Sequence, residues 1–166
     1  KECGEWYVSD TRFGPFVHAQ LYPGQENSGR LVTLLKQQAR ELAKRQGLDL
    51  VICDGSPGVG CPVISSLSGA SLAVAVVEPT PSGRHDFERV AALCDHFRIP
   101  VAVLINKADL NHEEVQAITR LADDKGYTVV GALPFDPAVT GAIIRRKALT
   151  ETDSPLASTL SAIWGR

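Results

Sequence analysis

The chain of 166 residues contains no methionine, only 6% aromatic residues and no long hydrophobic run. A membrane-spanning helix needs about 20 consecutive apolar residues, so we expect no membrane segment. Residues 1–6 lack the pattern of a secretory signal, and we expect a cytoplasmic location. Because methionine is missing even from the first position, we expect a processed product or an excised part of a longer protein.

Strong net charge is also missing. The formal charge is −2 and the isoelectric point is about 6.1. The composition therefore lacks the net positive charge that is typical of proteins that bind nucleic acid or an anionic membrane. The chain is 44% hydrophobic and 22% charged, which is typical of one globular domain with its own core.

The four cysteines, at positions 3, 53, 61 and 94, form no Cys-x-x-Cys pair. Zinc-finger and ferredoxin spacings are therefore absent from this segment. Cys53 and Cys94 lie in apolar runs, and we expect both to be small core residues in a reduced protein.

The hydrophobic pattern alternates between the periods of strands and helices. A pair of short strands is predicted at 6–22, with turn residues at 9–12, and a helix at 30–46 ends before Gly47. Buried strands are predicted at 48–53, 72–77, 101–105 and 128–133. The intervening and final helices have predicted caps at Ser82, Asn111 (with Glu114), Asp136 and Ser154.

Strands that alternate with helices predict an α/β fold, a three-layer, doubly wound and mostly parallel sheet. We expect one domain over 1–166, in which a strand pair at 1–22 precedes the alternating region at 27–166. Ligands of such sheets bind beyond the carboxyl ends of the strands, so the loops after the strands are the candidate sites.

The loop after the first buried strand reads Asp-Gly-Ser-Pro-Gly-Val-Gly-Cys-Pro at 54–62. An acidic residue at the end of an apolar strand is the Walker B arrangement, in which Asp54 would hold Mg²⁺ through water. Gly58 would bring its backbone N–H close to a phosphate with no Cβ in the way. The alternative for the Asp alone is a strand that ends in a polar turn.

The next three loops carry further polar residues. The loop at 78–86 leads into a helix N-terminus, which attracts anions, although a rigid connector explains it equally well. Asn106, Lys107 and Asp109 resemble the Asn-Lys-x-Asp purine-binding signature of GTPases, a short pattern that also occurs by chance. Residues 134–137 would form a wall beside a base.

Together these strings resemble the MinD-superfamily P-loop ATPases that contain an inserted ferredoxin domain, within the CobQ/CobB/MinD/ParA nucleotide-binding group. The similar strings are 24–32, 54–64, 78–83, 105–111 and 133–136, and the resemblance covers essentially the whole chain. It implies the SIMIBI type of P-loop fold and ATP hydrolysis with Mg²⁺ in a homodimer. It also implies two [4Fe–4S] clusters in the full-length protein, none of them bound by this segment.

The resemblance assigns roles to single residues. Asp54 and Gly58 become the Mg²⁺-side and switch residues, and Asn106, Lys107, Asp109, Pro134 and Asp136 become the base-side residues. The implied dimer and switch residues are Glu78, Thr80, Asp86 and Arg89. Cys61 follows Asp54 at the offset of a cluster-ligating Cys in the nitrogenase iron protein, a distant relative; the alternative is a buried Cys that shapes the loop.

One departure from the family is the lack of a Gly-rich loop with a phosphate-binding Lys. We therefore expect the part of the ATPase that follows the ferredoxin insert, without its Walker A strand. In this class of fold that strand lies beside the Walker B strand, so 48–53 and 72–77 would enclose a gap or pair non-natively. We expect this piece alone to bind ATP weakly or not at all; a micromolar Kd by calorimetry would contradict this.

The resemblance leaves three functions open. The first is ATP hydrolysis coupled to iron–sulfur electron transfer or metallocluster handling, with a redox or metalloenzyme partner. The second is a ligase similar to cobyrinic acid a,c-diamide synthase, for which Cys61 and His85 are insufficient as an amidotransferase arrangement. The third is a non-enzymatic, ParA-like partitioning or scaffold switch. Such a protein needs a basic DNA-binding surface or an amphipathic membrane helix, and the only basic cluster in the sequence is the short segment at 143–147.

Overall fold

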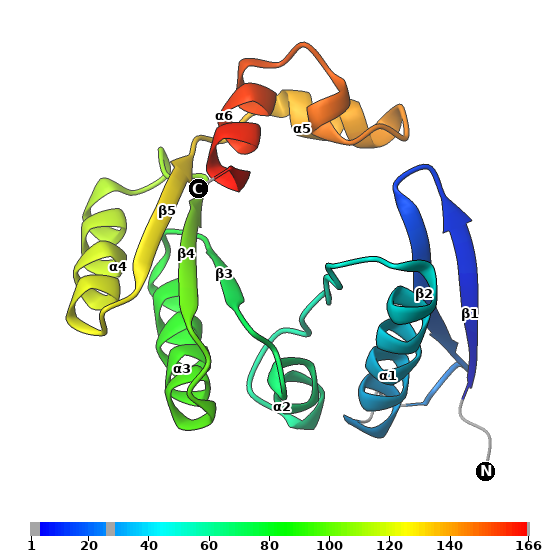
Figure 1. The fold of residues 1–166 in the computed structure, drawn as a ribbon. Coiled ribbons are helices and arrows are strands. Elements are labelled where there is room, and N and C mark those ends of the chain that lie inside the picture. Colours follow the sequence, from blue (N-terminus) through cyan, green and yellow to red (C-terminus); the bar gives the residue numbers. More distant parts are fainter. Residues whose placement is uncertain (1–3, 26–28, 166) are drawn as a thin grey trace. The chain divides into compact units, whose positions relative to one another are not determined.

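The computed structural model describes residues 4–25 and 29–165, which form two compact units (Figure 1). The first unit ends at Ala70 and the second begins at Ser71, and each is described by itself. Within the described ranges, no helix has the length and apolar character needed to cross a membrane.

The first unit begins with an antiparallel hairpin of β1 (Gly4–Thr11) and β2 (Gly14–Leu21). The predicted strand pair is confirmed, but the turn lies at 12–13 and not at 9–12. Ser9 and Asp10 remain in the ladder, because Gly14 takes a φ of 126° that allows the chain to reverse directly after Thr11. The Thr11 hydroxyl fastens this turn by donating to the Gly14 carbonyl at 2.6 Å.

The helix predicted at 30–46 is α1 (Gly29–Gln46), and it ends at Gly47 with a φ of 66°, as predicted. It packs against β2 and against α2 (Cys61–Leu67), a short helix that the sequence pattern did not predict. Lys36 on α1 is buried and donates to the carbonyls of Ser65, Ser66 and Ser68 at 3.0, 2.5 and 2.8 Å. One ammonium group therefore joins the two helices and caps the C-terminus of α2.

The strand predicted at 48–53 is wrong, because this segment has no regular secondary structure. Leu50 is 60% exposed and Ile52 is 74% exposed, and Cys53, which we expected in the core, is exposed as well. A parallel strand needs backbone partners, and within the described ranges β3 pairs only with β4. Without a ladder, the apolar pattern of this segment cannot produce a strand. The non-native pairing considered for 48–53 and 72–77 is likewise not among the described ladders.

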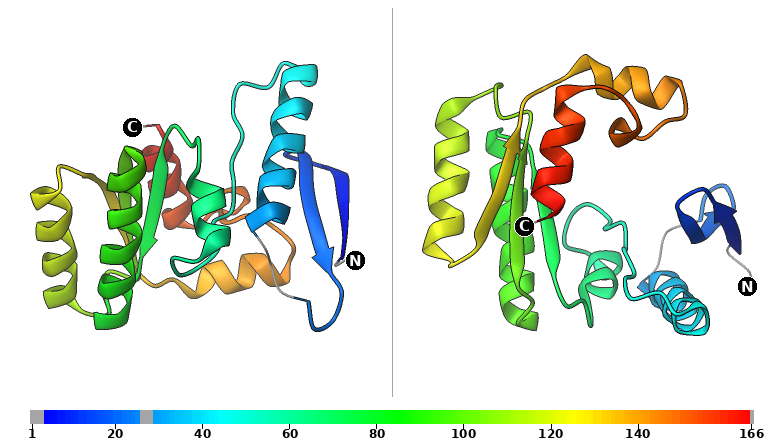
Figure 2. Two further views of the ribbon diagram at one scale, coloured as in Figure 1. Left: turned by 90° about the horizontal axis from the view of Figure 1, so that it is seen from below. Right: turned by 45° about the horizontal axis from the view of Figure 1, so that its top comes forward.

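The second unit is a parallel sheet in the order β3 (Ala73–Val77), β4 (Val101–Asn106) and β5 (Thr128–Leu133). The helices α3 (Pro81–Phe97) and α4 (His112–Asp124) cover one face, and α6 (Pro155–Trp164) covers the other (Figures 1 and 2). Between β5 and α6 lie α5 (Pro137–Ile144) and a 3₁₀ turn at Leu149–Glu151. Helices on both faces confirm the doubly wound α/β class.

The core of this sheet contains Val103, Ile105 and Ile118, which are almost fully buried. Cys94 is fully buried, as predicted, and burial raises the pKa of its thiol. On the other face Gly131 lets α6 approach β5, because a Cβ there would lie 2.5 Å from the Ile163 side chain.

Burial of the strands agrees with the prediction for β4 alone. The strand predicted at 72–77 forms as β3, but its predicted burial is wrong, since Val74 and Val76 are 55% and 61% exposed. The reason is that α3 covers only one face of β3, whereas α6 packs on β5.

The helix caps also follow the sequence, with two corrections. Asn111, Asp136 and Ser154 accept backbone N–H groups at the starts of α4, α5 and α6, as predicted. The Glu114 side chain, predicted to pair with the Asn111 cap, instead accepts a hydrogen bond from the Arg84 guanidinium at 2.9 Å. The cap of α3 is Thr80 and not Ser82, since Thr80 accepts the Gly83 N–H at 3.0 Å. Pro81 occupies the first helical position, where its missing N–H has no consequence. The helix therefore begins earlier in the chain than a cap at Ser82 predicts.

A polar cluster at the C-terminal end of α3 predicts acid sensitivity for the second unit. Lys125 donates to Asp95 at 2.6 Å and the Tyr127 hydroxyl donates to the other carboxylate oxygen. These hydrogen bonds hold the pKa of Asp95 in the folded protein below its usual value. They therefore stabilise the fold fully at pH values above the usual pKa, and this stabilisation is lost as the pH falls through the lowered pKa of the folded protein.

We expect Asp95→Asn to lower the free energy of unfolding at pH 7 by up to about 1 kcal/mol, since the pair is half exposed. The difference from the wild type should shrink below about pH 4, as measured by urea denaturation. Asp124→Asn, at an exposed position of α4, is the control. A difference that stays constant down to pH 2 would contradict the role given to the Asp95 charge.

Candidate functional site

Three loops of the second unit leave the carboxyl ends of β3, β4 and β5 at the same edge of the sheet. They hold Glu78, then Asn106 to Asp109, and then Pro134 to Asp136. The Ala108 N–H donates to the Leu133 carbonyl at 2.8 Å, so the second and third loops are joined through their backbones. The topology therefore gathers the predicted base-side residues at one edge.

Lys107 links the first two loops. Its ammonium lies 2.5 Å from a carboxylate oxygen of Glu78, and both side chains are partly exposed. The Lys107 backbone has a φ of 54°, a left-handed conformation that non-glycine residues rarely adopt and that concentrates at functional sites. The Leu110 N–H donates to the Lys107 carbonyl at 3.0 Å and helps to close this turn.

Asp109 links the second and third loops. One of its carboxylate oxygens accepts the backbone N–H of Phe135 at 2.6 Å. A charged acceptor at this distance makes a stronger hydrogen bond than a neutral one. The side chain that the signature places at the base thus holds the backbone of the neighbouring loop.

Asp136 has two partners of its own. One carboxylate oxygen accepts the Ala138 N–H at 2.8 Å and caps α5, as the sequence predicts. The other accepts the Ser154 hydroxyl at 3.2 Å, so the start of α6 is tied to the start of α5. The two caps were predicted separately, and their connection lies outside what a sequence pattern can reveal.

The predicted dimer residues of this unit lie at the start of α3 or near it. Thr80 caps the helix, whereas Asp86 and Arg89 are exposed on its surface. Their charged atoms are 3.9 Å apart, which is a loose i, i+3 pair that contributes little to stability. Both side chains remain accessible, and their role at a dimer surface stays a prediction.

The predicted residues of the first unit lie on the loop before α2. Asp54 is exposed, and Gly58 has a φ of 86°, a backbone conformation that itself favours glycine. Cys61, at the start of α2, is exposed, so the interpretation of this residue as a buried Cys is wrong. Within the described ranges, no three His, Cys, Asp or Glu side chains gather into a metal-binding group.

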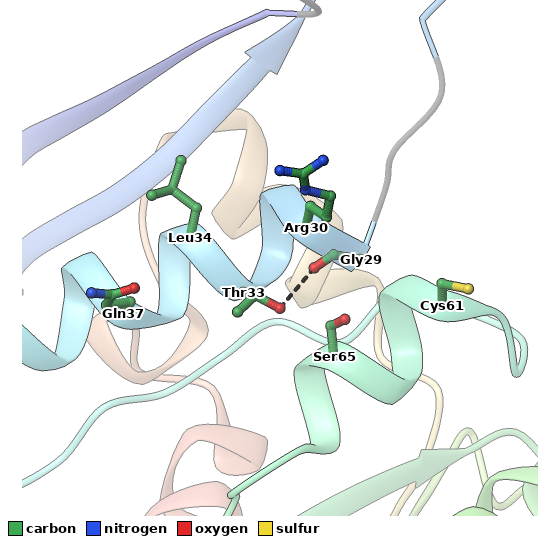
Figure 3. A pocket seen from close by; sticks show the side chains of 7 residues that line it. All are labelled: Gly29, Arg30, Thr33, Leu34, Gln37, Cys61 and Ser65. Atoms are coloured by element: carbon green, nitrogen blue, oxygen red, sulfur yellow. Dashed lines mark hydrogen bonds between the residues drawn. The ribbon is translucent and has the colours of Figure 1, made fainter.

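A shallow, open groove of about 760 Å³ runs between α1 and α2 in the first unit (Figure 3). Gly29 allows the two helices to meet, since a Cβ there would lie 2.5 Å from the Ser65 hydroxyl. The Thr33 hydroxyl is directed back to its own helix and donates to the Gly29 carbonyl at 2.9 Å. The sequence missed this groove because α2 was not predicted. Its lining residues are Gly29, Arg30, Thr33, Leu34, Gln37, Cys61 and Ser65.

No family model matches the chain, and the curated proteins similar to it in sequence are uncharacterized. It is 27% identical over 164 residues to the uncharacterized protein MJ0578 of Methanocaldococcus jannaschii, covering 99% of the chain and 54% of that protein. It is 22% identical over 125 residues to the uncharacterized protein MJ0579 of the same organism, covering 75% and 45%. The chain thus spans about half the length of these curated relatives.

Among solved structures, the chain is similar to the MinC:MinD cell division protein complex of Aquifex aeolicus. The TM-score is 0.65 at 18% sequence identity, over 94% of this chain and 64% of the matched chain. The fold is therefore the MinD-like α/β type, with a parallel three-stranded sheet between helices in the second unit.

Proposed function

We propose that the chain is the nucleotide-binding part of a MinD/ParA-like ATPase, which couples ATP hydrolysis to iron–sulfur electron transfer or metallocluster handling in the full-length protein. The observation that carries the proposal is the joining of three loops at the ligand-binding edge of the sheet. The bonds are Glu78–Lys107, Ala108–Leu133 and Asp109–Phe135. In a MinD-like fold, loops that are already joined at this edge of the sheet form a preformed site for a nucleotide.

In this proposal Asn106 and Pro134 lie beside the base. Asn106 ends β4 and is half-buried, with an amide that both donates and accepts hydrogen bonds, as a purine edge requires. Lys107 and Asp136 shape the same edge through the contacts given above. The exposed side chains of Asp86 and Arg89 are available to a second copy of the protein, and we assign them to a homodimer.

The donor chemistry of Asp54 fits Mg²⁺. The ion prefers hard oxygen ligands and keeps several waters, so one exposed carboxylate is sufficient when phosphate oxygens supply further ligands. When bound, the ion would neutralise the charge that develops on the phosphates. We assign the [4Fe–4S] clusters to a ferredoxin insert of the full-length protein, as the resemblance implies, because the four cysteines of this sequence form no Cys-x-x-Cys pair.

ATP binding by the full-length gene product tests the proposal. With Mg²⁺ present, we expect calorimetry to show ATP binding, and Asn106→Ala to weaken it about tenfold through lost hydrogen bonds to the base. Gln116→Ala, which removes an exposed amide on α4, should leave the affinity unchanged. A full-length protein that binds no ATP would overturn the proposal. Iron and sulfide analysis that finds no cluster would overturn its redox part alone.

A further inference from the structure

Phe135 combines a fixed backbone with an exposed aromatic ring. Its N–H is held by Asp109 at 2.6 Å, and the residue after it caps α5. Pro134 and Pro137 flank the turn and fix further backbone angles. The residue as a whole is 54% exposed. The chain thus orders the backbone of an aromatic residue and leaves much of its ring accessible at the ligand-binding edge of the sheet.

An aromatic ring on a fixed backbone is well suited to bind a flat ligand. Stacking on a base needs no hydrogen-bond pattern, because every base presents a π face. A fixed backbone also removes part of the entropy that a mobile loop would lose when the ligand binds.

We propose that Phe135 is the stacking platform for the nucleobase and that Asp109 is a positioning residue, which holds this platform through the Phe135 N–H. The inference rests on the proposed function and adds the residue that contacts the base. It gives Asp109 a different role from that of the Asn-Lys-x-Asp signature, in which the carboxylate itself accepts two bonds from guanine. Here one oxygen already binds the loop backbone.

The platform is completed by its neighbours at the same edge. The Ala108 N–H donates to the Leu133 carbonyl, so the chain before Phe135 and Phe135 itself are both tied to the segment after β4. Asn106, at the end of β4, has an amide whose donor and acceptor could pair with the edge of a stacked base. The triphosphate has no part in this contact. Recognition of the base is therefore separate from recognition of the phosphates.

The first experiment compares two ligands on the full-length protein with Mg²⁺. We expect Phe135→Leu, which keeps an apolar side chain of similar bulk, to weaken ATP binding about tenfold while binding of inorganic tripolyphosphate stays unchanged. Phe135→Trp should retain ATP affinity, because indole also stacks. Phe13→Leu, at another exposed aromatic residue in the hairpin turn, is the matched control.

Two outcomes would overturn the platform. One is unchanged ATP affinity in Phe135→Leu, and the other is an equal loss for ATP and tripolyphosphate, which would indicate a general disturbance of the loop. If the unmodified protein binds tripolyphosphate or ATP but Phe135→Leu has no effect, only the inference fails. If the unmodified full-length protein binds no nucleotide, the proposed function fails with it.

The second experiment separates positioning by Asp109 from direct reading of the base. Asp109→Asn keeps an oxygen that accepts the Phe135 N–H, so we expect ATP affinity within about threefold of the wild type and an unchanged preference between ATP and GTP. Asp109→Leu removes the acceptor and should weaken ATP about as much as Phe135→Leu does. Combining Asp109→Leu with Phe135→Leu should add little, because both act on the same contact. A changed ATP/GTP preference in Asp109→Asn would show that the carboxylate reads the base and would overturn the positioning role.

Discussion

Replacing Lys36 by Met is expected to lower the free energy of unfolding of the first unit by about 3 kcal/mol. The side chain is buried, and its ammonium donates to three carbonyls at the end of α2. All three donors of the ammonium are therefore used. Methionine keeps most of the apolar stem but leaves three carbonyl oxygens without this partner, and hydrogen bonds from a charged donor are among the stronger ones.

Urea denaturation followed by circular dichroism measures the effect. Lys44→Met is the matched control, because Lys44 lies on the same helix in an exposed position and should change the free energy by less than 0.5 kcal/mol, about the usual range for the surface. Limited proteolysis gives a second measurement, since loosening of α2 would expose the loop before it to cleavage. If Lys36→Met and Lys44→Met unfold at the same urea concentration, the three carbonyl bonds do not stabilise the unit.

The second unit was predictable because its local and tertiary signals agree. The runs at 101–105 and 128–133 are strongly apolar, and each has a neighbouring strand with which to form a ladder. Caps such as Asn111 depend only on residues close in sequence, and the structure confirms them. The segment at 48–53 has an equally clear apolar pattern but no ladder among the described strands, and the pattern alone could not show this.

The candidate site was predictable as a set of loops but not as a set of contacts. Parallel strands bring their carboxyl ends together, so residues after β3, β4 and β5 had to meet. Which atoms they use depends on the conformations of the loops. The bond from Phe135 to Asp109 spans 26 residues of the chain, and the bond from Lys36 to Ser65 spans 29. No spacing rule predicts such pairs. From the type of side chain alone, Asp109 is expected to contact a ligand and Lys36 to lie on the surface.

Asp54 is the residue on which the proposed hydrolysis depends most. It follows an apolar segment, it is exposed, and its carboxylate is suited to Mg²⁺. Because we assign it a contact through water, its loss should act as the loss of an outer ligand, which lowers metal affinity or activity by about 10- to 100-fold. The neutral amide of Asn has a similar shape, so Asp54→Asn removes the charge and leaves the loop around Gly58 in place.

We therefore expect Asp54→Asn to lower the rate of ATP hydrolysis by the full-length protein by up to about 100-fold and to raise the Mg²⁺ concentration needed for half-maximal rate. Asp49→Asn is the control, because this exposed carboxylate lies on the same segment and should leave both quantities unchanged. Phosphate release measured over a range of Mg²⁺ concentrations distinguishes the two variants. ATP binding measured without Mg²⁺ should stay within about twofold, since the carboxylate acts through the ion. Equal Mg²⁺ dependence in Asp54→Asn and the unmodified protein would remove Asp54 from the metal site, and a parallel loss of ATP binding without Mg²⁺ would show that it has a structural role in the loop.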